Sequence, residues 1–273
     1  MIPAAFDYVE ADSAEAAIAA LAEHGDESKL IAGGHSLIPL MRFRLATPSV
    51  LVDIGRISDL SYINDAGDHI AIGALTKHRA LETSALLKTE VPILAHVASQ
   101  VGDPSVRHRG TLGGSIAHGD PASDLPAALL ALGGSVMVKG PGGEREIAST
   151  DLFTGFLETA VGDDEMITEV RVPKVAGAGW SYQKFNRRAQ DWAIVGVAAV
   201  QNGSTGVALV NMGQTPIVAS AVQDALASGA DIDAAAAVAA EGTSPPEDLN
   251  GDAAYRSHLA QVLVKRALTE AAG

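Results

Sequence analysis

The 273-residue sequence contains no cysteine, which excludes disulfides, thiolate nucleophiles and Cys-ligated zinc or iron–sulfur centres within this chain. Aromatic residues make up only 4% of it, so aliphatic side chains must build most of the core. Apolar runs fall far short of the roughly 20 residues that span a bilayer. The first residues also lack the basic and apolar pattern of a secretory signal. We therefore expect a soluble, cytoplasmic protein that does not span a membrane.

Positive charge is also scarce. The chain has 19 Lys and Arg against 33 Asp and Glu, a formal net charge of -14. A surface this acidic repels a phosphate backbone, so we expect no nucleic-acid partner. If the chain binds a phosphorylated cofactor, backbone amides or a few placed cations must hold the anion against this overall charge.

The residues that are present favour a folded chain of two domains. Apolar residues make up 47% and charged residues 19%, which excludes an intrinsically disordered chain, and the length suits two domains. A capping-box pattern at residues 12–15 predicts a helix that ends near Gly25. The other elements predicted up to residue 175 are strands at 29–32, 50–54, 69–73 and 166–172, helices at 76–87 and 91–101, and a hairpin of 135–139 with 145–147.

Residues 102–126 interrupt this pattern. They are rich in Gly, Pro, Asp, Ser and His and show little periodicity, so we predict a long irregular segment. Such segments are uncommon inside compact domains and are often functional.

The last third of the chain follows a different plan. Residues 176–179, Ala-Gly-Ala-Gly, predict a linker. The elements predicted after it are an antiparallel meander of strands at 180–185, 192–200 and 206–212, then helices at 218–227, 232–240 and 252–271. Strands followed by helices indicate an α+β module.

Two turns of small residues are candidates for anion binding. Residues 32–36 read Ala-Gly-Gly-His-Ser and residues 111–115 read Thr-Leu-Gly-Gly-Ser. Adjacent glycines let the backbone turn sharply and bring several N–H groups to one anion, and a serine hydroxyl adds a donor. Neither turn has the spacing of a Rossmann or NTPase phosphate loop. Two such turns could grip both phosphates of a dinucleotide, although ordinary turns are the alternative for each.

Other chemistries remain open on the residues alone. Ser36 lies in a Gly-His-Ser-Leu-Ile segment that resembles the nucleophile elbow of serine hydrolases, with Ile38 in place of its last glycine. His118, Asp120 and Asp124 could bind a metal, but no second histidine stands at ligand spacing. We favour turn and helix-start roles for this segment, with Asp124 directed toward a ligand, and expect no metal site.

Charged residues form two further groups. Lys184, Arg187, Arg188 and Asp191 cluster where the second domain begins, and a cation there could neutralise a reduced, anionic ring; the alternative is a surface ion-pair patch. Trp192 beside them could belong to the core or lie against a planar ligand. The basic residues 107–109 could be a solvated face or a partner contact.

Residues 32–37, 52–54 and 72–74, and above all 101–115 with 117–126, resemble the FAD-binding medium subunits of the molybdenum hydroxylases. The resemblance continues through residues 182–188 and 191–193, and is closer to the aerobic carbon-monoxide-dehydrogenase type than to xanthine dehydrogenase. It implies an FAD domain at 1–176 of the vanillyl-alcohol-oxidase (PCMH-type) fold, with subdomains at about 1–56 and 57–176. A C-terminal domain at 177–273 would hold a small antiparallel sheet and three helices.

The resemblance also implies which residues bind FAD. Its diphosphate contacts would fall on the two small-residue turns, and an aromatic residue would lie against the isoalloxazine ring. The residues implied are Ala32, Gly33, Gly34, His35, Ser36, Val101, Thr111, Leu112, Gly113, Gly114, Ser115, Asp124, Ile167, Lys184 and Trp192.

By the same resemblance, the chain transfers electrons without acting on the organic substrate itself. A large molybdopterin subunit would oxidise the substrate, a small subunit would relay electrons through two [2Fe-2S] clusters, and FAD here would pass them to a terminal acceptor. The assembly would be a dimer of heterotrimers. The alternatives are a hydrolase using Ser36 and a flavin-free scaffold. No motif identifies the substrate or the acceptor.

Overall fold

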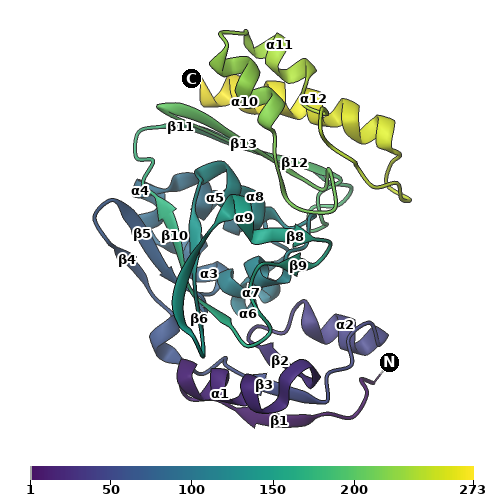
Figure 1. The fold of residues 1–273 in the computed structure, drawn as a ribbon. Helices are drawn as coiled ribbons and strands as arrows, with labels where there is room; N and C mark the ends of the chain where they lie inside the picture. Colours follow the sequence, from purple (N-terminus) through teal and green to yellow (C-terminus); the bar gives the residue numbers. More distant parts are fainter. Residues whose placement is uncertain (1) are drawn as a thin grey trace.

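The computed structural model describes residues 2–273 and consists of three sheets with helices packed between and around them, together with a two-stranded ribbon (Figure 1). The first part is a parallel three-stranded sheet in the order β1-β3-β2. Its strands are β1 (Asp7–Glu10), β2 (Ser28–Ile31) and β3 (Val50–Asp53), and its helices are α1 (Ala14–His24), η1 (Gly25–Glu27), α2 (Leu37–Phe43) and η2 (Ser58–Leu60). The Ser13 side chain accepts a hydrogen bond from the Ala16 N–H and Gly25 ends α1, which confirms the predicted helix. The strand β1 was not predicted.

The second part is an antiparallel sheet in the order β4-β5-β10-β6-β7. Its strands are β4 (Ile63–Asp65), β5 (His69–Gly73), β6 (Ser135–Gly140), β7 (Gly143–Ala148) and β10 (Met166–Pro173). The predicted hairpin is therefore confirmed. A small ribbon of β8 (Phe153–Gly155) and β9 (Glu158–Thr159) also appears, which the sequence did not predict.

Seven short helices accompany this sheet: α3 (His78–Thr83), α4 (Ala85–Glu90), α5 (Pro92–Gln100), α6 (Pro104–Arg109), α7 (Leu112–His118), α8 (Asp124–Leu132) and α9 (Ser149–Leu152). The prediction of an irregular segment at 102–126 was wrong. Its turn-like residues are helix caps: Asp103 caps α6 ahead of Pro104, and Thr111 caps α7. The helix predicted at 76–87 likewise breaks at Ser84, which caps α4.

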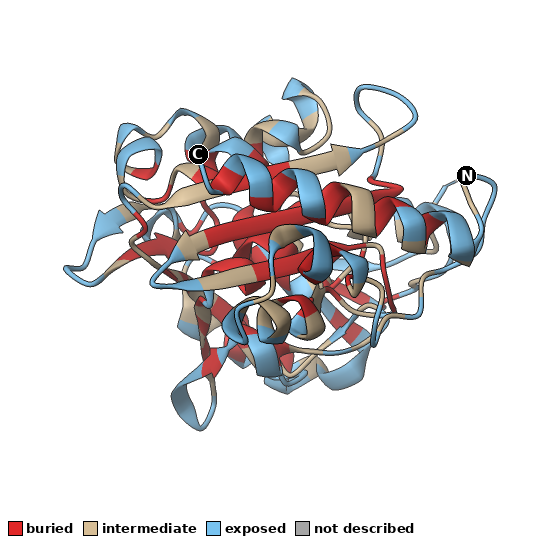
Figure 2. Cartoon of the chain, turned by 90° about the horizontal axis from the view of Figure 1, so that it is seen from above, coloured by how far each residue is buried: buried red, intermediate tan, exposed pale blue. Residues whose placement is uncertain are grey.

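The third part confirms the predicted meander and helices. Its sheet has the order β11-β12-β13-β14. The elements are β11 (Gly179–Phe185), β12 (Val195–Asn202), β13 (Ser204–Val210), β14 (Ile217–Val218), α10 (Ser220–Ala227), α11 (Ile232–Ala237) and α12 (Ala253–Ala271). One face of this sheet lies beneath α12 (Figure 2), and the other packs on α5 and α8. Coverage on both faces explains why nearly all of β12 is buried and apolar.

Within residues 2–273, no helix has the length and apolar character needed to cross a membrane.

Candidate functional site

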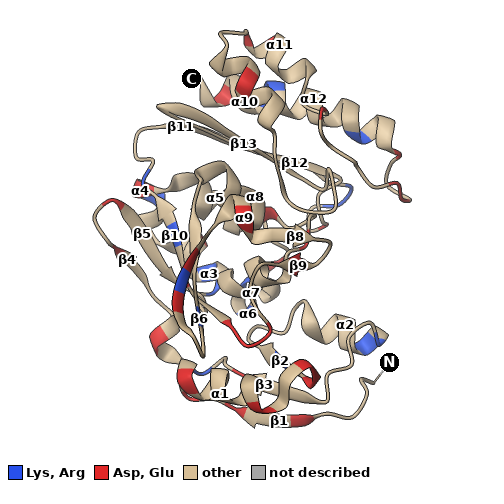
Figure 3. Cartoon of the chain, viewed as in Figure 1, with Lys and Arg blue, Asp and Glu red and all other residues tan. Residues whose placement is uncertain are grey.

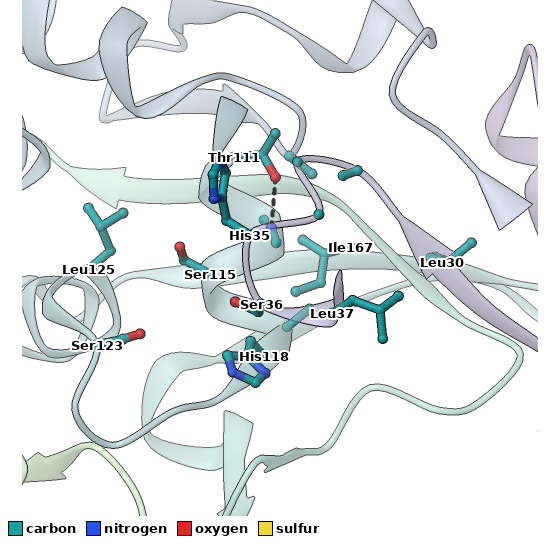
Figure 4. A pocket seen from close by; sticks show the side chains of 18 of the residues that line it. Leu30, His35, Ser36, Leu37, Thr111, Ser115, His118, Ser123, Leu125 and Ile167 are labelled. Atoms are coloured by element: carbon teal, nitrogen blue, oxygen red, sulfur yellow. Dashed lines mark hydrogen bonds between the residues drawn. The ribbon is translucent and has the colours of Figure 1, made fainter. Parts of the chain in front are cut away.

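A cavity of about 940 Å³ lies between the first sheet, the helices α7 and α8, and the start of the third part (Figure 4). This volume is at the upper end of the range for small-molecule sites. Fourteen of the fifteen candidate residues line it: Ala32, Gly33, Gly34, His35, Ser36, Val101, Thr111, Gly113, Gly114, Ser115, Asp124, Ile167, Lys184 and Trp192. Leu112 is the exception, because its side chain is buried in the core.

The first small-residue turn is open toward the cavity. It follows β2 directly, and Gly34 has a left-handed backbone with φ of 76°. A Cβ atom at Gly33 would lie 2.5 Å from the Arg109 carbonyl oxygen and 2.9 Å from the Gly110 Cα, so this turn touches the backbone just before α7. Among the hydrogen bonds of residues 2–273, none uses an N–H of residues 33–36 as donor. These amides can therefore bind an anion in the cavity.

The second turn differs from what its sequence suggested. The Leu112 N–H donates to the Thr76 carbonyl at 2.9 Å and the Gly113 N–H donates to Ala74 at 2.8 Å. The Gly114 N–H reaches the Thr111 Oγ1 at 3.2 Å, as in a helix N-cap. Its amides are thus largely engaged by the protein itself. This turn offers the cavity the Ser115 hydroxyl and the space left by Gly114, while the first turn supplies the free amides.

A buried polar group lies at another wall of the cavity. The Lys184 Nζ lies 2.8 Å from Asp124 Oδ2 and 3.0 Å from the Gln100 carbonyl oxygen, and the Lys184 and Asp124 side chains are each 8% exposed. The Tyr182 hydroxyl donates to the other Asp124 oxygen. Burial raises the pKa of Asp124, whereas Lys184 and Tyr182 act to lower it. Burial also raises the pKa of Tyr182 well above its usual value, so this hydroxyl stays protonated and can donate.

Sequence reasoning did not assign Tyr182 or His78 to the site. Tyr182 precedes Lys184 by two residues on β11, a spacing that places both side chains on one face of the strand. His78 is 2% exposed, and its Nε2 lies 3.2 Å from the Ser115 hydroxyl. Burial, together with the nearby His35, Lys77 and Arg107, lowers the pKa of His78 to about 4. His78 is therefore a neutral partner of Ser115 near pH 7. No spacing signal in the sequence links these two residues.

The charged cluster predicted at 184–191 separates into two groups. Lys184 is buried beside Asp124, whereas Arg188 makes two hydrogen bonds of 2.8 Å to Asp191 on the loop after β11. Trp192 was predicted to begin a strand, but β12 begins at Val195 and Trp192 is 57% exposed on that loop. The indole still lines the cavity, so it can contact a planar ligand from the solvent side.

The alternative chemistries find no support in this geometry. No hydrogen bond between residues 2–273 joins the Ser36 hydroxyl to a histidine, as a serine nucleophile requires. Asp124 is engaged by Lys184 and Tyr182, and no group of three potential metal ligands comes together in the described part of the chain. In the basic segment, Arg107 has a structural role, since it binds Glu82 at 3.0 Å and the carbonyl oxygens of Val101 and Gly102.

Two family models match the chain. Residues 4–175 match the FAD binding domain in molybdopterin dehydrogenase, and residues 180–271 match the CO dehydrogenase flavoprotein C-terminal domain.

Similar proteins cover the whole chain. The carbon monoxide dehydrogenase medium chain of Hydrogenophaga pseudoflava is 39% identical over 99% of this chain and 98% of its own length. The 6-hydroxypseudooxynicotine dehydrogenase complex subunit alpha of Paenarthrobacter nicotinovorans is 40% identical over 99% and 96%. A solved carbon monoxide dehydrogenase structure from H. pseudoflava superposes with a TM-score of 0.96 at 40% identity, covering 99% of this chain and 98% of that one. This likeness confirms the predicted α+β fold of the vanillyl-alcohol-oxidase type.

Proposed function

The chain belongs to the family of FAD-binding medium subunits of molybdenum hydroxylases, and from that membership we propose that it collects electrons from an iron–sulfur partner and passes them to a terminal acceptor. It is thus an oxidoreductase subunit whose cofactor is FAD. The observation that carries the proposal is the open turn at 33–36, which lines a cavity large enough for a dinucleotide and whose N–H groups bond to no acceptor within residues 2–273.

The residues present fit FAD. The N–H groups of residues 33–36 and the hydroxyls of Ser36 and Ser115 would hold the diphosphate without a lysine or arginine, which suits an acidic chain. The absence of a Cβ at Gly33 lets the first turn approach the backbone of Arg109 and Gly110, directly before the second turn. Val101, Ile167 and Trp192 would supply apolar contacts to the flavin.

The buried pair of Lys184 and Asp124 would set the electrostatics beside the flavin. Bound FAD accepts electrons singly or in pairs, which allows it to connect one-electron and two-electron carriers. Lys184 places a cation at the cavity wall, and Asp124 and the Gln100 carbonyl fix its position. Tyr182 in turn orients Asp124.

The other centres of such an enzyme would lie in partner chains. The sequence has no cysteine for an iron–sulfur cluster, and relatives are named medium chains or subunits of complexes. We therefore propose a small subunit with [2Fe-2S] clusters and a large subunit with molybdopterin, arranged as a dimer of heterotrimers. The large subunit would select the substrate.

Titration with FAD tests this function. The flavin-stripped chain should bind one FAD, and at a concentration about 100-fold above Kd the native state should gain about 2.7 kcal/mol, seen as a higher Tm. FMN lacks the diphosphate bridge and should stabilise the chain much less. Absence of flavin absorbance after gentle purification, with no FAD-dependent rise in Tm, would instead favour a flavin-free scaffold. Labelling of Ser36 by a fluorophosphonate would revive the hydrolase alternative.

A further inference from the structure

A second cavity of about 810 Å³ adjoins the first on the side of the loop between β11 and β12. Asp191 and Trp192 line both cavities, so this part of the loop lies at their common boundary. The second cavity is open to solvent on one side, and its other lining residues come from Phe156, the segment 120–122, the residues that follow β13 and the segment 244–250. Phe156 is 59% exposed and Trp192 57%, which leaves two aromatic surfaces available to a ligand.

The two arginines of this loop have different surroundings. Arg188 is held by its two bonds to Asp191, whereas Arg187 makes no hydrogen bond or ion pair with any residue in the described range 2–273. Figure 3 shows this loop as one of the few basic places on the ribbon beside β12. Arg187 lines the cavity, and its guanidinium is free to bind an anion there.

The carboxylates of the cavity are already engaged. Asp248 pairs with the buried Arg256 at 2.7 Å, and Asp191 pairs with Arg188. Asp120 accepts the Ala122 N–H at 2.8 Å and lies 3.9 Å from the His118 ring. Arg187 is therefore the one cation lining this cavity, among residues 2–273, that makes no ion pair. The hydrogen bond from Arg188 and, to a smaller extent, the charge of Arg187 lower the pKa of Asp191, but the Asp191 carboxylate is already bound by Arg188.

The wall around Asn211 is held in place before any ligand binds. The Asn211 backbone is left-handed, with φ of 62°, and its N–H donates to Pro121. Its side-chain amide donates to the carbonyl oxygens of Ala193 and Ile194, the residues that follow Trp192. These bonds tie residues 193–194 to Asn211 and, through it, to Pro121, so this part of the wall needs little ordering on binding.

We propose that this second cavity binds a quinone that carries an anionic group. The anionic group would bind Arg187, and the planar quinone ring would lie against Trp192 and Phe156. Aromatic faces suit a planar ring, and a free guanidinium suits a sulfonate, carboxylate or phenolate. The binding follows from the residues of this cavity alone. Its role as the site of the terminal acceptor rests on the proposed function, because only then does a flavin lie across the indole.

Fluorescence of Trp192 provides the test. The chain has two tryptophans, so Trp180→Phe leaves Trp192 as the reporter in the full-length chain, with or without FAD. Anthraquinone-2-sulfonate should quench it saturably, and the neutral 2-(hydroxymethyl)anthraquinone should bind about tenfold more weakly. Arg187→Gln should remove this difference, whereas Lys88→Gln, which changes the net charge equally on α4, should preserve it. Calorimetric titration of the chain that retains Trp180 should give the same Kd.

Three outcomes would overturn the proposal: no saturable quenching, equal affinity for the sulfonate and the neutral analogue, or unchanged sulfonate affinity in Arg187→Gln. Flavin uptake is measured on the same samples. Failure to bind FAD would therefore refute the proposed function separately, while the quinone titration would still decide what the second cavity binds.

Discussion

Replacing Gly33 with alanine is expected to abolish FAD retention. The added Cβ would lie 2.5 Å from the Arg109 carbonyl oxygen and 2.9 Å from the Gly110 Cα, and both are backbone atoms that cannot turn aside. The turn at 33–36 would have to move away from the segment before α7, which would displace its free amides. Loss of two hydrogen bonds to a charged group costs about 3 kcal/mol or more, so Kd for FAD should rise by about 100-fold or more.

Flavin content after purification and a titration followed by flavin fluorescence measure this effect. Gly142→Ala is the matched control, because no heavy atom lies within 4 Å of the added Cβ and the residue is in the turn between β6 and β7. It should bind FAD normally. Thermal unfolding of the flavin-free Gly33→Ala chain shows whether it folds. A folded Gly33→Ala chain with a full complement of FAD would show that this turn does not hold the diphosphate.

The two small-residue turns show what sequence can and cannot predict. From the composition of the two turns we predicted that both contribute to one site, and residues 33–36 and 113–115 do line one cavity. Composition could not show that the amides of the second turn are engaged, because their acceptors are Ala74 and Thr76, about 40 residues earlier in the chain. Hydrogen-bond partners so distant in sequence depend on the tertiary fold, which local pattern does not contain.

The same limit explains the errors in the fold. Strands such as β12 could be predicted because a strand that is buried on both faces has an uninterrupted run of apolar residues in the sequence. Residues 102–126 were misjudged because Asp, Ser, Thr and Pro favour turns and helix caps alike. Short helices such as α6 and α7 are stabilised by their tertiary contacts rather than by their own propensity.

The buried ion pair gives the second large effect. Lys184→Met is expected to destabilise the chain by about 3–5 kcal/mol at pH 7, because it leaves the Asp124 carboxylate buried without its cation. Methionine fills much of the space of the lysine stem, so the loss is mainly electrostatic. Lys184 now lowers the pKa of Asp124 against the effect of burial. Its removal should therefore raise that pKa further above the value in the unfolded chain.

This shift makes stability depend on pH in a defined direction. A carboxyl group whose pKa is higher in the folded chain binds its proton more tightly there than in the unfolded chain. Its contribution to stability is therefore greatest below its pKa in the unfolded chain, near 4, and is lost as the pH rises through its pKa in the folded chain. Urea unfolding of Lys184→Met between pH 5 and 8 should show this fall more steeply than the original chain. Adding Asp124→Asn to Lys184→Met removes the titrating group and should recover part of the stability and flatten the profile. A Lys184→Met chain as stable at pH 8 as at pH 5 would show that Asp124 gains another partner or water, and that the pair does not fix the charge beside the flavin cavity.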